Sequence, residues 1–316
     1  MRKFIIDTDT ASDDAAAIML AVLSKEIEIV GVTVVAGNVD LVQAGKNALM
    51  SLEVCHSEVP VYLGSSRPLF REAEETISVH GIDGMGDMDI IHPKRTVEVI
   101  NAVDFILQTV RDNPDDIEIA VLGPATNIAL AILNDRKTMS KVKHIWSMGT
   151  PGFGPGNATP VAEFNVFIDA EAYAIMLDAG IPTTIIGFDM CAGEIGVDVN
   201  ELAYMAGQSE VGQFLKDATT VLLEFNRQTR AADMVDLPDA IAMAAALWSD
   251  FTVSKVRCSC HCCINDGPTY GQVIFYQQGR TYEAMPELKE ANVEVISAVD
   301  EEIFTSRFMN IISKGV

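Results

Sequence analysis

Residues 4–24 read FIIDTDTASDDAAAIMLAVLS, and this segment decides the fold. It opens with a short apolar run of the kind that forms buried strands. Four aspartates then precede an apolar stretch long enough for a helix. We therefore expect a strand over Phe4–Asp9 and a helix over about Asp13–Ser24. A strand that leads straight into a helix is typical of parallel α/β proteins.

The same alternation continues along the chain. Further strands are predicted at Ile27–Val35, Val59–Leu63, Ile117–Leu122, His144–Met148 and Thr183–Phe188. Helices are predicted between them at Leu41–Val54, Val97–Val110, Thr126–Asn134 and Ala170–Ala179. Near-continuous apolar strands separated by helices indicate a parallel sheet that is buried on both faces. The fold class is therefore α/β.

The C-terminal third has a different order of elements. Residues 200–249 are mostly of helical pattern, and a last amphipathic helix is expected at Glu301–Ser313. Between them lie β-like stretches at Ser254–Ile264, Gln272–Gln277 and Val293–Val299. Since no repeat, linker or change of composition divides the chain, we expect one elaborated domain over residues 1–316. Its mostly parallel central sheet would be flanked by helices.

Composition narrows the choice of partners and compartment. The chain has 22 Lys and Arg against 45 Asp and Glu, a formal net charge of -23. Such a surface repels phosphate backbones and anionic lipids, so we expect no nucleic acid and no membrane partner. The apolar run at the N-terminus is too short for a signal peptide. The six cysteines are unevenly spaced, which favours free thiols in the cytoplasm.

The aspartate cluster is the strongest chemical signal. Asp7, Asp9, Asp13 and Asp14 lie within eight positions. Crowding them at a strand-to-helix turn costs on the order of several kcal/mol unless a cation neutralises them. Oxygen ligands without nearby His or Cys indicate calcium or magnesium. A preference of aspartate for helix N-termini explains Asp13 and Asp14 but not the other two.

Polar segments also follow three other predicted strands, at Gly37–Asn38, Leu122–Asn127 and Met148–Asn165. Ligands of open parallel sheets bind outside the carboxyl ends of the strands. We therefore expect these segments to meet the aspartate cluster at one rim of the sheet.

One alternative is a phosphatase. The segment Asp7–Thr10 resembles the aspartyl-phosphate motif of haloacid-dehalogenase-type enzymes, with Asp7 as nucleophile, Asp9 as general acid and magnesium as the metal. Position 11 is Ala, where that family usually has Thr or Val, and the doublet Asp13-Asp14 has no role there. This alternative stays open.

Four segments in order resemble the inosine-uridine-preferring nucleoside hydrolase family. They are DTDTASDD at residues 7–14, VVAGN at 34–38, LGPATNIA at 122–129 and GNATPVAEFN at 156–165. The first resembles that family's metal motif, with Thr10-Ala11 in place of Pro-Gly. The resemblance implies hydrolysis of the N-glycosidic bond of ribonucleosides to ribose and free base. It also implies Ca²⁺ as cofactor and a homodimer or homotetramer.

The resemblance assigns residues to three roles. The metal ligands would be Asp9, Asp14, the Leu122 carbonyl and Asp239. The residues at the ribose would be Asp13, Asn38, Met148, Asn157, Glu163 and Asn165. Asp9 would take a proton from a calcium-bound water, which then attacks C1′ of the ribose. The ribose segment, Gly152–Asn165, contains no Lys or Arg, which argues against phosphorylated substrates.

The chain departs from the family where the leaving base is expected. Many members have a His immediately before the last aspartate, and this chain has Pro238. His80 matches another family histidine and is the candidate for contacting the base; Asp236 is a less favoured candidate for the proton donor. Phe225 and Asn226 stand where some members have tyrosines. These departures leave the choice of purine or pyrimidine open, and they also allow a nucleoside- or ribose-binding protein without turnover.

Overall fold

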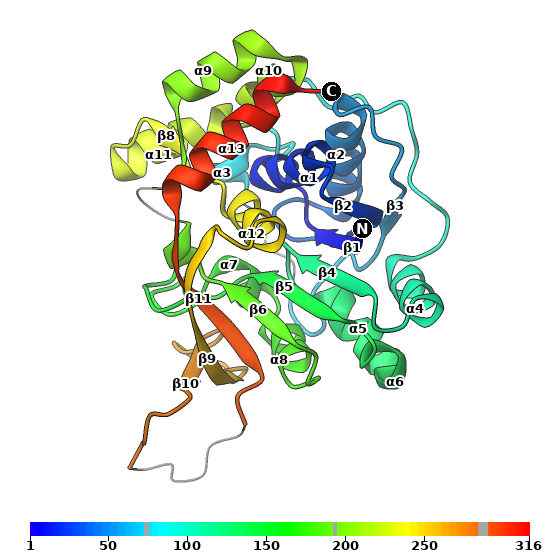
Figure 1. Ribbon diagram of the computed structural model, residues 1–316, viewed down its shortest axis with the longest axis vertical. Coiled ribbons are helices and arrows are strands. Elements are labelled where there is room, and N and C mark those ends of the chain that lie inside the picture. Colours follow the sequence, from blue (N-terminus) through cyan, green and yellow to red (C-terminus); the bar gives the residue numbers. More distant parts are fainter. Residues whose placement is uncertain (73–75, 192–194, 284–289) are drawn as a thin grey trace.

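The computed structural model describes residues 1–72, 76–191, 195–283 and 290–316, and its centre is a nine-stranded sheet (Figure 1). The strands in spatial order are β10 (Val273–Gln277), β9 (Thr252–Cys262), β11 (Val293–Val299), β6 (Thr183–Ile186), β5 (His144–Met148), β4 (Ile117–Val121), β1 (Arg2–Thr8), β2 (Ile27–Val34) and β3 (Val61–Leu63). All neighbouring pairs from β11 to β3 are parallel, and β9 is antiparallel to both of its neighbours. The predicted mostly parallel α/β sheet is confirmed.

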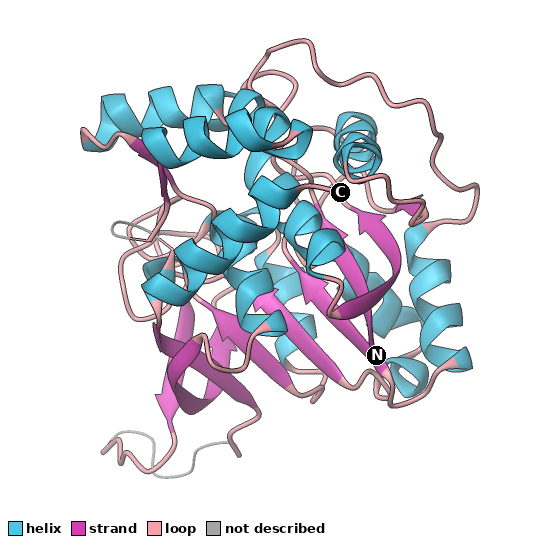
Figure 2. Ribbon diagram, turned by 45° about the horizontal axis from the view of Figure 1, so that its top comes forward, coloured by secondary structure: helices cyan, strands magenta, loops and turns pink. Residues whose placement is uncertain are grey.

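Helices cover both faces of this sheet, as Figure 2 shows. One face carries α1 (Ser12–Ser24), α2 (Leu41–Val54), α12 (Pro238–Leu247) and α13 (Glu301–Lys314). The other carries α4 (Ala102–Asp112), α5 (Thr126–Asn134) and α8 (Ala170–Leu177). Strand β1 shows why helices must cover both faces of the sheet. Phe4 and Ile6 belong to the first core and Ile5 to the second, because successive side chains of a strand point to opposite faces.

Shorter elements complete the chain around the site. They are α3 (Ile77–His80), α6 (Arg136–Met139), α7 (Phe164–Ile168), the 3₁₀ helix η1 (Phe188–Met190), α9 (Val199–Gln208), α10 (Glu210–Ala218) and α11 (Thr220–Arg230). A two-stranded sheet pairs β7 (Val197–Asp198) with β8 (Met234–Val235). Helix α11 packs against α3, which brings two segments far apart in the sequence to one place.

Several predicted boundaries differ from the structure, and for two of them the reason can be identified. The helix predicted from Val97 begins only at Ala102, because the Asn101 side chain caps it by accepting from the Val103 amide at 2.9 Å. The preceding residues instead extend beside β3, where the Glu98 amide donates to the Val61 carbonyl at 2.8 Å. The strand predicted to reach Phe188 ends at Ile186, because residue 188 starts η1.

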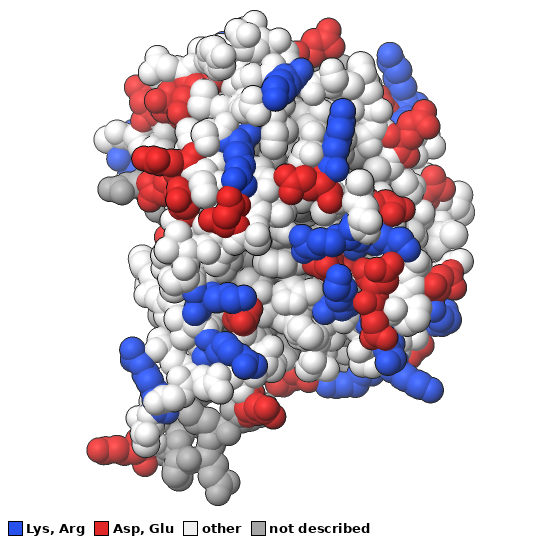
Figure 3. All heavy atoms as spheres, in the orientation of Figure 1, with Lys and Arg blue, Asp and Glu red and all other residues white. Residues whose placement is uncertain are grey.

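On the face drawn in Figure 3, charge is mixed, with basic side chains next to acidic ones. The exposed pair Arg307–Asp250, with a nitrogen–oxygen distance of 2.8 Å, is one example of such neutralisation. Across the ranges that the structure describes, no helix is long and apolar enough to cross a membrane.

Glu118 provides a test of the central sheet. It is buried on β4 and accepts hydrogen bonds from Arg2 Nε at 3.0 Å and Trp146 Nε1 at 2.9 Å. Burial alone would raise the pKa of this carboxyl, but these hydrogen bonds and the charge of Arg2 outweigh it and lower the pKa to about 2. The ionised carboxylate therefore stabilises the fold above its unfolded pKa of 4.5, and this contribution declines as pH falls toward 2.

We expect Glu118→Gln to lower the free energy of unfolding by about 1–2 kcal/mol at pH 7, because hydrogen bonds to a charged group are lost. The difference from wild type should shrink at pH 3.5. Urea unfolding at the two pH values measures both quantities. A penalty of equal size at pH 7 and pH 3.5 would contradict the assignment.

Candidate active site

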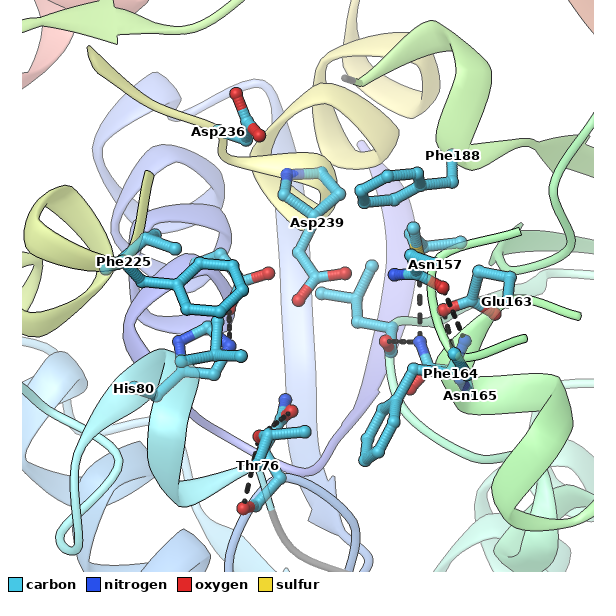
Figure 4. Close-up of a pocket in the computed structure, with 18 of the residues that line it drawn as sticks. Thr76, His80, Asn157, Glu163, Phe164, Asn165, Phe188, Phe225, Asp236 and Asp239 are labelled. Atoms are coloured by element: carbon cyan, nitrogen blue, oxygen red, sulfur yellow. Dashed lines mark hydrogen bonds and ion pairs between the residues drawn. The ribbon is translucent and has the colours of Figure 1, made fainter. Parts of the chain in front are cut away.

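A cavity of about 200 Å³ lies where the parallel strands end (Figure 4). Its walls come from the segments after β1, β2, β4 and β5, together with α3, α11 and the start of α12. Of the predicted site residues, it brings together Asp13, Asn38, His80, Leu122, Met148, Asn157, Glu163, Asn165 and Asp239. Asp9 and Asp14 are fully buried and do not line it. The expected meeting of strand ends at one rim is therefore observed.

Three carboxylates form a candidate metal centre, two of them lining the cavity and the third, Asp14, buried beside them. Oxygen atoms of Asp13, Asp14 and Asp239 all lie within 4.8 Å of one another. The first two come from the N-terminus of α1 and the third from the first turn of α12. Asp13 Oδ1 is buried without a hydrogen-bond partner. An unpartnered carboxylate oxygen beside two further carboxylates suits a hard cation.

Asp9 lies beside this group in a narrow space. Its Oδ2 accepts from the Asn38 amide at 2.7 Å, and its Oδ1 is buried without a partner. Glycine makes room for it on two sides. A Cβ atom on Gly37 would come within 2.1 Å of Asp9 Oδ2, and one on Gly123 within 2.6 Å of Oδ1. The absence of a side chain at each of these two glycines, which belong to separate motifs, thus leaves space for the Asp9 carboxylate.

Burial and crowding raise the pKa values of the aspartates in the cluster. Burial, with repulsion from Asp14, raises the pKa of Asp9 well above its ordinary value, and burial with the neighbouring aspartates does the same for Asp239. Burial also raises the pKa of Asp14 to about 7 and that of Asp13 to about 6. These groups resist ionisation until positive charge is supplied. The donor set contains only oxygen, so the residues fit calcium or magnesium.

The Leu122 carbonyl, predicted as a metal ligand, accepts from Asn165 Nδ2 at 2.7 Å. A carbonyl oxygen has two lone pairs, so one remains for a second partner. This hydrogen bond joins the end of β4 to α7, and it fixes the amide of Asn165 at the cavity wall.

Three of the predicted ribose residues, Asn157, Glu163 and Asn165, share one wall, seen at the right of Figure 4. Glu163 caps α7: its Oε1 accepts from the Asn165 amide at 2.9 Å and its Oε2 from the Thr150 amide at 3.2 Å. Burial raises the pKa of Glu163 to about 7. Asn157 Oδ1 accepts from the Phe164 amide at 3.0 Å. The wall offers carboxylate and amide groups, which suit neutral hydroxyls rather than phosphate.

His80 lies at the end of α3, beside the aspartates. Its Nδ1 is 2.8 Å from Ser12 Oγ, and its Nε2 is 3.8 Å from Asp13 Oδ1. Burial lowers the pKa of His80 to about 4. The imidazole is therefore neutral at pH 7, so it can exchange hydrogen bonds with a ligand but holds no extra proton to give away.

Asp7 does not occupy the place of a phosphatase nucleophile. It is fully buried, and its Oδ1 accepts from Thr33 Oγ1 at 2.5 Å and Asn127 Nδ2 at 2.8 Å. It is absent from the wall of the cavity. Because its Oδ1 ties β1 to β2 and α5, Asp7 has a structural role and not the role of nucleophile that the phosphatase alternative requires.

Several lining residues were not predicted from the sequence. Phe188 from η1, Leu222 and Arg230 from α11 and Thr76 before α3 all face the cavity. Phe225, Asn226, Asp236 and Pro238, noted for their departures from the family pattern, line it too. No local pattern marks the unpredicted residues, because packing of distant segments places them there.

Comparison with known proteins agrees with this site. A family model described as inosine-uridine preferring nucleoside hydrolase matches residues 4–306. The chain is 30% identical over 308 residues to the pyrimidine-specific ribonucleoside hydrolase RihB of Escherichia coli, covering 96% of this chain and 94% of that protein. It is 41% identical over 190 residues to an uncharacterized Schizosaccharomyces pombe protein, covering 60% of this chain and 61% of that protein.

Solved structures show the same architecture. A plant nucleoside hydrolase, the PpNRh1 enzyme, superposes with a TM-score of 0.92 at 29% identity, covering 99% of both chains. A purine-preferring ribonucleoside hydrolase from Gardnerella vaginalis gives a TM-score of 0.90 at 29% identity, covering 99% of this chain and 98% of that one.

The crowded carboxylates predict a pH dependence of the metal-free protein. Between pH 4 and pH 7 the folded state holds protons on Asp13 and Asp14 that the unfolded state has released, since their ordinary pKa is 3.8. The free energy of unfolding should therefore fall as pH rises through this window. Thermal unfolding with a chelator should show a lower melting temperature at pH 7.5 than at pH 5.5.

Added calcium should raise the melting temperature at pH 7.5, and Asp14→Asn should flatten the pH dependence. Asp112→Asn, at an exposed position at the end of α4, is the control and should change neither. A chelated protein that is as stable at pH 7.5 as at pH 5.5 and does not respond to calcium would exclude a metal centre here.

Proposed function

The chain belongs to the inosine-uridine preferring nucleoside hydrolase family, and on that premise we propose that its cavity binds a ribonucleoside against a calcium ion, with Asp9 as general base. The chain is an N-glycosyl hydrolase that converts ribonucleosides to ribose and free base. One observation carries the proposed mechanism. Buried carboxylates converge at the floor of a cavity whose wall is built for hydroxyl groups.

We propose that Asp9, Asp14, Asp239 and the Leu122 carbonyl hold the metal. Nucleoside hydrolases depend on a metal, and the unpartnered oxygens of Asp9 and Asp13 support a cation at this place. Calcium, when bound, supplies a Lewis acid whose shell accepts oxygen atoms in irregular geometry. Calcium tolerates irregular coordination better than magnesium does. This favours calcium here, because the carboxylates come from two helices and a strand end.

Asp9 is proposed as the general base because one of its oxygens is already held and the other is free. The hydrogen bond from the Asn38 amide fixes the carboxylate, and Oδ1 remains to accept a proton from the attacking water. The water oxygen attacks C1′ as the bond from C1′ to the base nitrogen breaks. Its proton passes to Asp9.

The remaining polar residues are proposed to bind ribose. Asp13, Asn38, Asn157, Glu163 and Asn165, with Met148 beside them, would contact its hydroxyls. As the base departs, positive charge develops on the sugar ring, and nearby carboxylates stabilise it. The hydrogen bonds that fix Glu163 and Asn165 support this role, because they orient both groups before a ligand arrives.

The base would lie between aromatic side chains. Phe188 and Phe225 lie on opposite sides of the cavity in Figure 4, with Asp239 between and below them. His80, neutral at pH 7, is proposed to hydrogen-bond to the base or its ribose. The relatives named above include both a pyrimidine-specific and a purine-preferring enzyme, so their names do not decide the base.

We also propose that the enzyme is a homodimer or homotetramer in the cytoplasm. All six cysteines are free thiols, with Cys263 half-buried and the other five buried, which is consistent with a reducing compartment. Size-exclusion chromatography with light scattering determines the oligomeric state.

Removal of the general base tests the mechanism. Asp9→Asn should lower turnover of ribonucleosides by roughly 10²–10⁴-fold, because that is what a positioned base contributes. The measurement is reducing-sugar release from a panel of purine and pyrimidine ribonucleosides, with and without a chelator. Asp112→Asn again serves as the matched control and should keep wild-type activity. A fully active Asp9→Asn enzyme would contradict the assignment, and binding without sugar release by the wild type would contradict turnover.

A further inference from the structure

An ion pair between an exposed arginine and a buried carboxylate lies at the end of the cavity opposite Thr76. Arg230 Nη1 donates to Asp236 Oδ2, and both residues line the cavity. The Asp236 side chain is 8% exposed and that of Arg230 is 36% exposed, so the carboxylate is buried and the guanidinium reaches solvent. Figure 4 shows Asp236 at this end, above Asp239 and between Phe225 and Phe188.

The local chain path makes this pair. Helix α11 ends at Arg230 because Ala231 adopts the left-handed conformation, with φ of 53°. The chain then turns back through β8, and Asp236 arrives beside the last helical residue. The guanidinium also lies 5.8 Å from the centre of the Phe188 ring. Arg230 is thus held from two sides at the aromatic end of the cavity.

Arg230 is also positively charged, whereas the other charged residues that line the cavity are carboxylates. Four carboxylates line the cavity, at Asp13, Glu163, Asp236 and Asp239. Among the described residues of the lining, Arg230 alone carries a permanent positive charge, since His80 is neutral at pH 7. A guanidinium has five N–H donors, and the structure assigns one of them to Asp236. The others remain for a ligand.

The reaction creates negative charge at this end. When the C1′–N bond breaks, its electron pair moves to the base nitrogen and spreads onto the carbonyl oxygens of a base such as uracil or hypoxanthine. Pro238 has no side-chain donor to meet that charge, and neutral His80 has no extra proton to give. A fixed cation that donates hydrogen bonds can stabilise the charge without transferring a proton.

We propose that Arg230 is the catalytic group that stabilises the departing base and that Asp236 is the positioning residue that orients it. The inference rests on the proposed function and adds to it a means of leaving-group stabilisation. Arg230 keeps all its protons. The electron pair stays on the base, which takes a proton from solvent after the bond has broken, while the proton of the attacking water goes to Asp9.

The test compares two arginines of the same helix. Arg227 also lies on α11, with an exposed side chain that pairs with Asp233, and it is absent from the cavity wall. Arg230→Gln and Arg227→Gln therefore remove the same charge from the same helix at different places. Each is assayed for kcat on uridine, on inosine and on 4-nitrophenyl β-D-riboside, whose leaving group needs little stabilisation. Melting temperatures verify that both variants fold.

Arg230→Gln should lose roughly 10²–10³-fold in kcat on uridine and inosine, the usual effect of removing one donor aimed at developing charge. It should stay within about threefold of wild type on the nitrophenyl riboside, and Arg227→Gln should stay near wild type on all three substrates. Arg230→Lys should recover part of the lost activity, since it restores the charge without the planar donors.

Two outcomes would overturn the inference alone. One is a kcat of Arg230→Gln on uridine and inosine within threefold of wild type. The other is an equal loss on the nitrophenyl riboside, which would show damage to the site rather than to leaving-group stabilisation. A wild-type enzyme that cleaves none of the three substrates would instead refute the proposed function, and the inference with it.

Discussion

The structure depends on one electrostatic constraint: five aspartates are buried near the end of β1, and among the described residues no Lys or Arg forms an ion pair with them. Asp7 Oδ1 is held within the fold by a hydroxyl from β2 and an amide from α5, while its Oδ2 is buried without a partner. The others point toward a common space, where Asp9 Oδ1 and Asp13 Oδ1 lack partners. Carboxylates in such a place are stable only with a cation or bound protons. The site therefore favours the binding of a cation, which would neutralise carboxylates that the fold itself does not neutralise.

Backbone and packing bring these charges together. Asp13 and Asp14 begin α1, where the helix dipole favours negative charge, and Asp14 Oδ2 also accepts from the Ala11 amide at 2.9 Å. Asp239 begins α12 in the same way, after Pro238 in the first turn. The two helices pack against each other, and both are rich in buried alanine. Small side chains allow close approach, so the same residues that form the core also set the spacing of the charges.

Sequence reasoning worked where one local signal dominated. The apolar runs predicted β5 and β11, and helical periodicity predicted α2, all with the observed boundaries. It failed at Val97, where a backbone bridge to β3 overrides helical spacing. Most of the candidate metal and ribose residues could be named because they occur in short contiguous motifs at strand ends, and Asp239 because its motif starts a helix. Arg230 and Phe188 could not, because they acquire their positions from the packing of α11 and η1, which no local pattern records.

The two ends of the cavity thus have separate origins in the chain. The metal and ribose end is built from strand termini and helix starts inside the sheet architecture, whereas the base end is contributed largely by α3, α11 and η1, outside the sheet. Substitutions in α11 alter what meets the base without moving the carboxylates under the sugar. Base preference can therefore drift in evolution while bond cleavage is retained. Enzymes named for pyrimidines and for purines both resemble this chain, as that separation would produce.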